Sequence, residues 1–209
     1  MSSPLSTVVR NHLAALRMLL VFTVITGIAY PLLVTGVAQA AFSDQANGSL
    51  VKQNGKTVGS SLLGQNFNLP KKNPNDADEV AKPDPKWFQP RPSAGGYDPT
   101  VSGASNLGPN NTDLIKTIKE RKAAVAAFDG VSPDSVPADA VTASGSGLDP
   151  DISKAYADEQ IARVAKTRGL DESTVSKLVA DNTHSRALGF LGEEYVNVVE
   201  LNLALANLK

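Results

Sequence analysis

The chain has 209 residues, no cysteine, two histidines and a formal net charge of −1. Without cysteine there are no disulfides and no thiolate metal sites. The near-neutral charge provides no basic surface for nucleic acid, and only 5% of the residues are aromatic, which leaves few side chains for stacking on bases. The composition therefore predicts no nucleic-acid partner.

An uncharged run of 26 residues, 18–43, dominates the N-terminal part of the chain. As a helix with a rise of ~1.5 Å per residue, it is longer than the ~30 Å hydrocarbon core of a bilayer. We predict a transmembrane helix over 13–43, kinked near Pro31, after a short tail over 1–12. A cleaved signal peptide ending at Ala40 is the alternative, but its apolar region would exceed the ~7–15 residues usual for such peptides.

Small residues and a proline within this run are typical of a helix that packs against other helices in the lipid bilayer. The candidate packing residues are Gly27, Tyr30, Pro31 and Gly36. Arg10 and Arg17 precede the run, and all 21 acidic residues lie from Asp44 onward. The positive-inside rule therefore places residues 1–12 in the cytoplasm and residues 44–209 in a periplasmic or extracytoplasmic domain.

The first part of that domain is rich in turn-forming residues. Asn54-Gly55 predicts a type I′ hairpin within residues 47–65. Residues 70–86 combine prolines with charges of both signs, which indicates an exposed, mobile loop. Residues 87–111 hold the only tryptophan among Gly, Pro, Ser and Asn, so we expect an ordered loop. Its order could serve to pin it to the core or to shape it for a partner surface.

Helical patterns follow. One helix is predicted over 111–128, capped by Asn111 or Thr112. A second ends at Arg168-Gly169 and is capped by Asp149 or Ser153. A short third helix is predicted to be capped by Asp171. Residues 136–143 suggest a short strand. The alternation in 201–205 favours a strand over 195–208, with a helix as the alternative. The predicted fold class is α+β: one transmembrane helix, then one mixed α/β domain with a small sheet and about three helices.

Few residues carry a chemical signal. The turn Ser144-Gly145-Ser146-Gly147 lacks the lysine of a phosphate-binding P-loop, so glycine-permitted turn geometry explains it better. Asp149 and Asp151 are more simply helix caps than a catalytic carboxylate pair. Arg91 lies between two prolines and is placed to contact a carboxylate, either within the chain or on a partner. We predict no catalytic residue and no metal site.

Two classes of function remain open from the residues alone. The chain could be an accessory subunit whose helix packs in a larger membrane complex. It could also be a free-standing, membrane-anchored periplasmic binding or sensor module.

Sequence blocks along almost the whole chain resemble the C-subunit (KdpC) family of the Kdp high-affinity potassium-transporting P-type ATPases. The blocks are residues 30–36, 45–50, 63–67, 91–94, 105–107, 141–144, 146–149, 163–165 and 196–205. Two departures are that Ala104 replaces a glycine usual in the family, and Asp151 replaces the His or Asn of many relatives. The resemblance adds a set of candidate partner-facing or motif residues: Arg91, Pro92, Ser93, Ser105, Asn106, Leu107, Ser146, Gly147, Leu148 and Asp149.

The resemblance implies a non-catalytic accessory subunit of an ATP-driven potassium importer in the bacterial inner (plasma) membrane. Its partners would be a channel-like potassium-selective subunit, a P-type ATPase subunit that binds ATP and Mg, and a small membrane peptide. We expect the span to stabilise their assembly and the domain to cover the outer potassium entrance.

Members of this family have also been proposed to raise the ATP affinity of the ATPase subunit as catalytic chaperones. Direct nucleotide contact by Ser146 or Gly147 would require the opposite membrane orientation. In the predicted orientation, any effect on ATP affinity is therefore indirect. We expect no cofactor bound to this chain.

Overall fold

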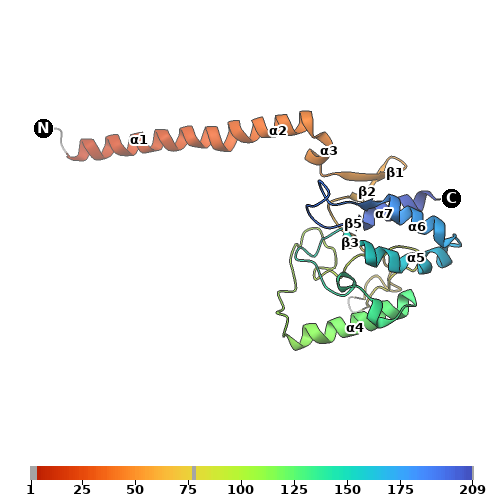
Figure 1. Cartoon of the computed structure of the whole chain (residues 1–209). Coiled ribbons are helices and arrows are strands. Elements are labelled where there is room, and N and C mark those ends of the chain that lie inside the picture. The colour runs from red at the N-terminus through yellow and green to blue at the C-terminus, as the bar shows by residue number, and fades with distance from the viewer. Residues whose placement is uncertain (1–3, 77–78, 209) are drawn as a thin grey trace. The chain divides into compact units, whose positions relative to one another are not determined.

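The computed structural model describes residues 4–76 and 79–208 (Figure 1). Parts of three predicted segments lie outside the described residues: 1–3 of the tail, 77–78 of the exposed loop, and the last residue of the domain. The chain divides into two compact units, Met1–Ser49 and Leu50–Lys209.

The N-terminal unit is built on one long helix, which confirms the predicted apolar helix near the N-terminus. It comprises α1 (Pro4–Val24), a π-helical segment η1 (Ile25–Ala29) and α2 (Tyr30–Ala41), and it is followed by the short helix α3 (Ser43–Ala46). The stretch Ser6–Ala41 is long and apolar enough to cross a membrane, and its most apolar window is 0% buried. Residues 4–12 of the predicted tail belong to the same helix.

The second unit begins with the predicted hairpin, which the structure confirms. Strands β1 (Leu50–Gln53) and β2 (Lys56–Ser60) pair antiparallel. Asn54 and Gly55 join them with φ angles of 50° and 78°. Positive φ at both central residues is what a type I′ turn requires.

Three predicted helices are confirmed as α4 (Thr112–Asp129), α5 (Lys154–Arg168) and α6 (Glu172–Asp181). The side chain of Asn111 accepts hydrogen bonds from the first turn of α4, and that of Ser153 does so for α5. Asp171 precedes α6, but the predicted cap is wrong, because its side chain makes no capping hydrogen bond. Side-chain caps therefore mark the starts of α4 and α5 but not that of α6.

One strand prediction is wrong, and a second is confirmed only at its first residues. Residues 136–143 contain no strand. The 3₁₀ turn η3 (Ala138–Ala140) lies here, after a first 3₁₀ turn, η2 (Pro133–Ser135), and Pro137 has no N–H to donate to a neighbouring strand. Of residues 195–208, only β5 (Tyr195–Asn197) is a strand, and α7 (Val198–Asn207) is a helix. The Asn197 side chain caps α7, and its buried positions recur with helical spacing: Val198, Leu201, Asn202 and Leu205.

The predicted small sheet is two sheets. The second has the order β3-β5-β4, with β3 (Asp151–Ser153) and β4 (Thr183–His184) both antiparallel to β5. Helix α5 contacts α4 and α6, and α6 contacts α7. The core between these elements is mostly aliphatic and includes Val164, Val175, Val179, Val196, Leu201 and Leu205, together with Phe88 from the long loop.

Candidate functional site

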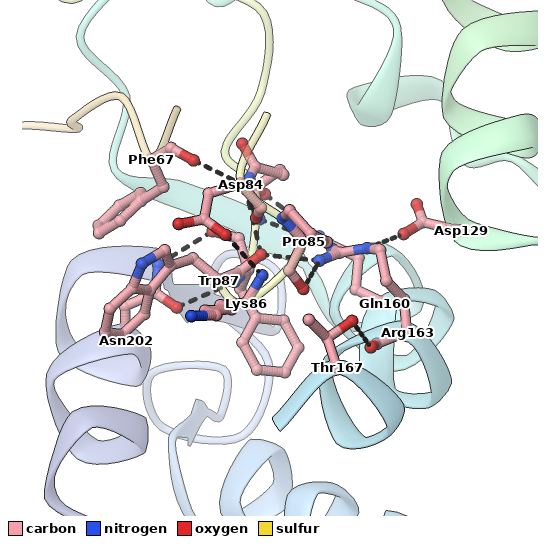
Figure 2. Close-up of polar contacts among 12 residues, drawn as sticks. Phe67, Asp84, Pro85, Lys86, Trp87, Asp129, Gln160, Arg163, Thr167 and Asn202 are labelled. Carbon is pink, nitrogen blue, oxygen red and sulfur yellow. Dashed lines mark hydrogen bonds and ion pairs between the residues drawn. The ribbon is translucent and has the colours of Figure 1, made fainter. Parts of the chain in front are cut away.

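A buried polar network ties the loop segment 84–89 to helix α5 (Figure 2). Arg163 donates to Oδ1 of Asp129 at 2.6 Å and to the carbonyl oxygens of Pro85 and Trp87 at 2.8 and 2.9 Å. The side chains of Arg163 and Asp129 are only 5% and 1% exposed. Burial raises the pKa of Asp129, although the hydrogen bond and charge of Arg163 oppose this rise. A buried charge pair of this kind holds only because its hydrogen bonds are made.

Two side-chain amides hold consecutive residues of the same loop. Asn202 of α7 accepts from the N–H of Phe88 at 3.0 Å and donates to its carbonyl at 2.9 Å. Gln160 of α5 does the same for Gln89, at 2.6 and 3.2 Å. We call these two pairs the amide clamps. They satisfy the buried backbone of a segment that has no neighbouring strand.

Aromatic contacts complete the attachment of this segment. The guanidinium of Arg168 lies 4.7 Å from the ring centre of Trp87 and donates to the carbonyl of Leu205 at 2.7 Å. Residues 72–76 of the predicted exposed loop are exposed, whereas Asp84 and Pro85 are half-buried. The segment 84–89 is therefore fixed by contacts from both α5 and α7.

The candidate residues around Arg91 meet in a second region, which we call the loop cluster: residues 91–97, 102–103 and 144–149. Arg91 donates to Oδ2 of Asp149 at 2.8 Å, and the two side chains are 24% and 27% exposed. Asp149 is thus the partner of Arg91 and not the cap of α5; its Oδ1 accepts from the N–H of Asp151 at 3.0 Å. The carboxylate that the sequence left unidentified for Arg91 lies within the chain.

Ser93 and Tyr97 extend the loop cluster. The Ser93 hydroxyl donates to the carbonyl of Gly147 at 2.6 Å and accepts from the N–H of Tyr97 at 3.0 Å. The Tyr97 hydroxyl donates to the carbonyl of Arg91 at 2.7 Å. Burial raises the pKa of Tyr97, so this hydroxyl stays protonated and remains a donor.

The glycine-rich turn uses its own polar groups. The N–H of Gly147 donates to Oγ of Ser144 at 2.9 Å, and the N–H of Leu148 donates to Oγ of Ser146 at 3.1 Å. The carbonyl of Ser146 accepts from the N–H of Gly103 at 2.8 Å. Gly147 has φ +67°, and a Cβ there would lie 2.7 Å from the Gly103 carbonyl oxygen. Two N–H groups of the turn, those of Gly147 and Leu148, are therefore engaged by its own hydroxyls and do not point to a phosphate site.

The remaining candidates lie elsewhere. Ser105, Asn106 and Leu107 are exposed on the loop between the cluster and α4. Leu148 is buried, and its carbonyl accepts from the N–H of Gly64 at 2.8 Å. Pro92 lines a cavity of about 410 Å³ beside Arg91, with walls that include Val125, Phe128, Tyr156 and Arg121. The helix candidates Gly27, Tyr30, Pro31 and Gly36 are all exposed in the N-terminal unit.

Sequence reasoning missed the polar side chains of the buried network. Gln89 and Gln160 have no predicted role, Asp129 is predicted only as part of the stop that ends the helix over 111–128, and Arg163 and Asn202 occur only within the family blocks. A signal was present on α5, where Gln160 and Arg163 occupy buried positions beside Ala157 and Val164. Polar residues on the apolar stripe of a helix indicate long-range hydrogen bonds.

An exposed apolar group on the β4–β5 connection was also missed. Leu188, Phe190 and Leu191, which we call the apolar tip, are 82%, 69% and 50% exposed. A hydrogen bond from the N–H of Ala187 to the carbonyl of Leu191 at 2.9 Å closes the turn. The ion pair Arg186–Glu193, at 2.8 Å, lies at its base. Large apolar side chains gathered on an ordered turn are typical of an interaction surface.

Comparison with known proteins agrees with the resemblance seen in the sequence. The family model described as "KdpC: K+-transporting ATPase, c chain" matches residues 12–207. A protein of Streptomyces avermitilis named potassium-transporting ATPase KdpC subunit is 52% identical, covering 100% of this chain and 98% of its own. Proteins of the same name from Kineococcus radiotolerans and Mycobacterium tuberculosis are 52% and 48% identical, covering 98% and 95% of this chain and 97% and 99% of their own. The chain therefore belongs to the KdpC family, the c chains of K+-transporting ATPases.

Proposed function

We propose that this chain is a non-catalytic accessory subunit of an ATP-driven potassium uptake complex in the bacterial inner membrane. The observation that carries the proposal is the helix Ser6–Ala41, which is long and apolar enough to cross a membrane and buries none of its most apolar window within the chain. Its close relatives are named as subunits of a potassium-transporting ATPase. A helix of this kind is stable in lipid, where helices of other subunits can pack against it.

The first proposed role is assembly. The helix holds together a channel-like potassium-selective subunit, an ATPase subunit that carries out hydrolysis, and a small membrane peptide. The second role belongs to the folded domain, which covers the outer potassium entrance. The exposed apolar tip and the internally hydrogen-bonded loop cluster support this role, because an ordered surface with apolar side chains loses little entropy on binding.

An effect on the ATP affinity of the ATPase subunit is indirect in this proposal. With Arg10 and Arg17 on the cytoplasmic side, the domain and the cellular ATP lie on opposite sides of the membrane. The chain then changes ATP affinity only by favouring one conformation of the assembly.

The two roles separate in a truncation. A chain that ends after Ser49 retains the whole N-terminal unit and loses the folded domain. In the full complex, we expect this variant to copurify with the other subunits in mild detergent and to import potassium with an affinity lowered about tenfold. Unchanged potassium affinity would contradict the covering role, and loss of copurification would contradict the assembly role of the helix.

The orientation is tested with single cysteines, because the native chain has none. Lys56→Cys lies at the exposed start of β2, next to the hairpin turn, and Ser6→Cys lies near the N-terminal end of the long helix. In intact spheroplasts we expect an impermeant maleimide to label only Lys56→Cys. Labelling of Ser6→Cys alone would reverse the orientation, and with it the covering role.

A further inference from the structure

The transmembrane helix has a local break in its backbone hydrogen bonds. In a regular α-helix, the carbonyls of Thr26 and Gly27 would accept from the N–H groups of Tyr30 and Pro31. Here the N–H of Tyr30 donates to the carbonyl of Ile25 instead, which is the π-helical pattern of Ile25–Ala29. Proline has no N–H. The carbonyls of Thr26 and Gly27 therefore both lose the donors of a regular helix.

The hydroxyl groups near the break do not replace these donors. Thr26 donates its hydroxyl to the carbonyl of Phe22 at 2.7 Å, and Thr23 donates to the carbonyl of Leu19 at 2.8 Å. Both hydroxyls thus donate to carbonyls of the preceding turn and not to those of Thr26 and Gly27. The break lies well inside the apolar stretch Ser6–Ala41, where water is not available to hydrogen-bond a carbonyl.

The side of the helix that carries the break is also open. A Cβ built on Gly27 would meet only the Cγ2 atom of Thr23, at 3.9 Å, so Thr23 and Gly27 share one face. The missing side chain at Gly27 leaves the backbone accessible to a closely packed neighbour. Two carbonyl acceptors beside a glycine make a surface that complements a hydrogen-bond donor.

We propose that a transmembrane helix of another subunit packs on the Thr23–Gly27 face and donates a hydrogen bond to the carbonyl of Thr26 or Gly27. The donor chemistry is a serine or threonine hydroxyl or a side-chain amide, carried on a helix with small residues at the contact. Such groups join helices in membranes, and π-turns recur at functional positions. The inference rests on the proposed assembly role and assigns its contact point.

Photo-crosslinking in the assembled complex tests the location. We would place p-benzoylphenylalanine at Thr23 in one full-length variant and at Val21 in a matched control. Val21 is two residues away, roughly 200° around the helix, and is 50% exposed. We expect Thr23 to crosslink to a subunit in higher yield than Val21. Equal or lower yield at Thr23, in a complex that still copurifies, would overturn the inference and leave the assembly role standing.

Replacement of the proline tests the hydrogen bond itself. Pro31→Ala supplies the N–H that a regular α-helix pairs with the carbonyl of Gly27, and it lets the N–H of Tyr30 return from Ile25 to the carbonyl of Thr26, so that both acceptors are satisfied within the helix. Alanine also favours helix, so misfolding does not confound the result. We expect the retention of partner subunits in detergent to fall about 3- to 10-fold, as for loss of one interhelical hydrogen bond. Leu32→Ala, which changes an exposed neighbour without changing the backbone donors, should retain them.

The outcomes distinguish the two levels of the proposal. Equal retention in Pro31→Ala and Leu32→Ala would overturn the hydrogen bond. Failure of the native chain to copurify with any membrane subunit would instead overturn the proposed function.

Discussion

Two arginine–carboxylate pairs in the folded domain have the same chemistry and different surroundings. Arg163 and Asp129 are 2.6 Å apart and nearly inaccessible, and Arg163 also binds the carbonyls of Pro85 and Trp87. Arg91 and Asp149 are 2.8 Å apart, and about a quarter of each side chain is exposed. Water screens the second pair and can replace it, whereas nothing replaces the first.

The buried pair therefore contributes more to the stability of the domain, and the partly exposed pair leaves its region able to contact a partner. The buried pair determines where the loop 84–89 lies, so its loss should unfold or loosen the domain. The loop cluster around Arg91 depends more on its backbone geometry than on its charges, and it remains partly open to solvent and to a partner. Four substitutions test this distinction, and the tryptophan at position 87 reports on unfolding because it is the only one in the chain.

The largest loss of stability is expected for Arg163→Ala. Removing one member of a buried ion pair leaves an unpaired charge, here Asp129, and costs about 3–5 kcal/mol. Denaturant unfolding of the full chain in detergent, followed by Trp87 fluorescence, gives the change in free energy. Lys166→Ala, on the exposed side of the same helix, should change it by less than about 0.5 kcal/mol. Similar losses for both variants would contradict the role of the network.

Gly147→Ala should be the next most damaging. The alanine would need φ +67° and would place Cβ 2.7 Å from the Gly103 carbonyl oxygen, for a cost of about 2–3 kcal/mol. Gly145→Ala is the matched control, because a Cβ at Gly145 meets no heavy atom within 4 Å. The same unfolding assay compares them. If the two alanines behave alike, the backbone of the turn does not restrain the loop cluster.

Arg91→Ala should cost less than Arg163→Ala, about 1–2 kcal/mol, because its ion pair is partly solvated. Lys122→Ala, which removes an exposed pair with Asp134 at 3.5 Å, should cost less than about 0.5 kcal/mol. Measuring copurification of the other subunits alongside stability separates an internal role of Arg91 from a contact with a partner. A loss as large as that of Arg163→Ala would erase the distinction between the pairs.

The smallest expected effect is stabilising and depends on pH. Burial, and then the charge of Asp149, raises the pKa of Asp151 to about 6. A carboxyl with a higher pKa in the folded than in the unfolded chain reduces stability above that pKa, and the penalty fades as the pH falls from 6 towards 4. Asp151→Asn keeps an oxygen that can accept from Asn197, which now bonds Oδ1 at 3.0 Å.

We therefore expect Asp151→Asn to raise the free energy of unfolding by up to about 1 kcal/mol at pH 7.5, after allowing for solvent screening. The gain should disappear near pH 4. Unfolding curves of both chains across this pH range provide the measurement, and a gain that grows as the pH falls would contradict the assigned pKa shift.

Local signals explain which elements could be predicted. The helices α4 and α5 carry both an apolar periodicity and a side-chain cap within a few residues, so their position follows from nearby sequence. The alternation in 201–205 predicted too long a strand, because the buried residues 198, 201, 202 and 205 also fit a helix. The stronger signal was the helix cap Asn197, with Glu200 three residues later.

The candidate site was less predictable because its contacts join distant parts of the chain. Arg91 was recognised as a contact residue, but its partner is 58 residues away. Asn202 lies 114 residues from Phe88. No local pattern predicts such pairs, because the two partners come together only in the folded chain.

The amide clamps have a consequence for how the polypeptide matures. One clamp comes from α5, but the other comes from α7, which a ribosome makes after every other element described here. During synthesis, the N–H and the carbonyl of Phe88 therefore both lack their partner, Asn202, until α7 emerges. If translation stops, or a protease cuts the chain, before α7, the product keeps the membrane helix but lacks Asn202, which holds the loop 84–89 at Phe88. Such an incompletely folded domain is a target for quality-control proteases.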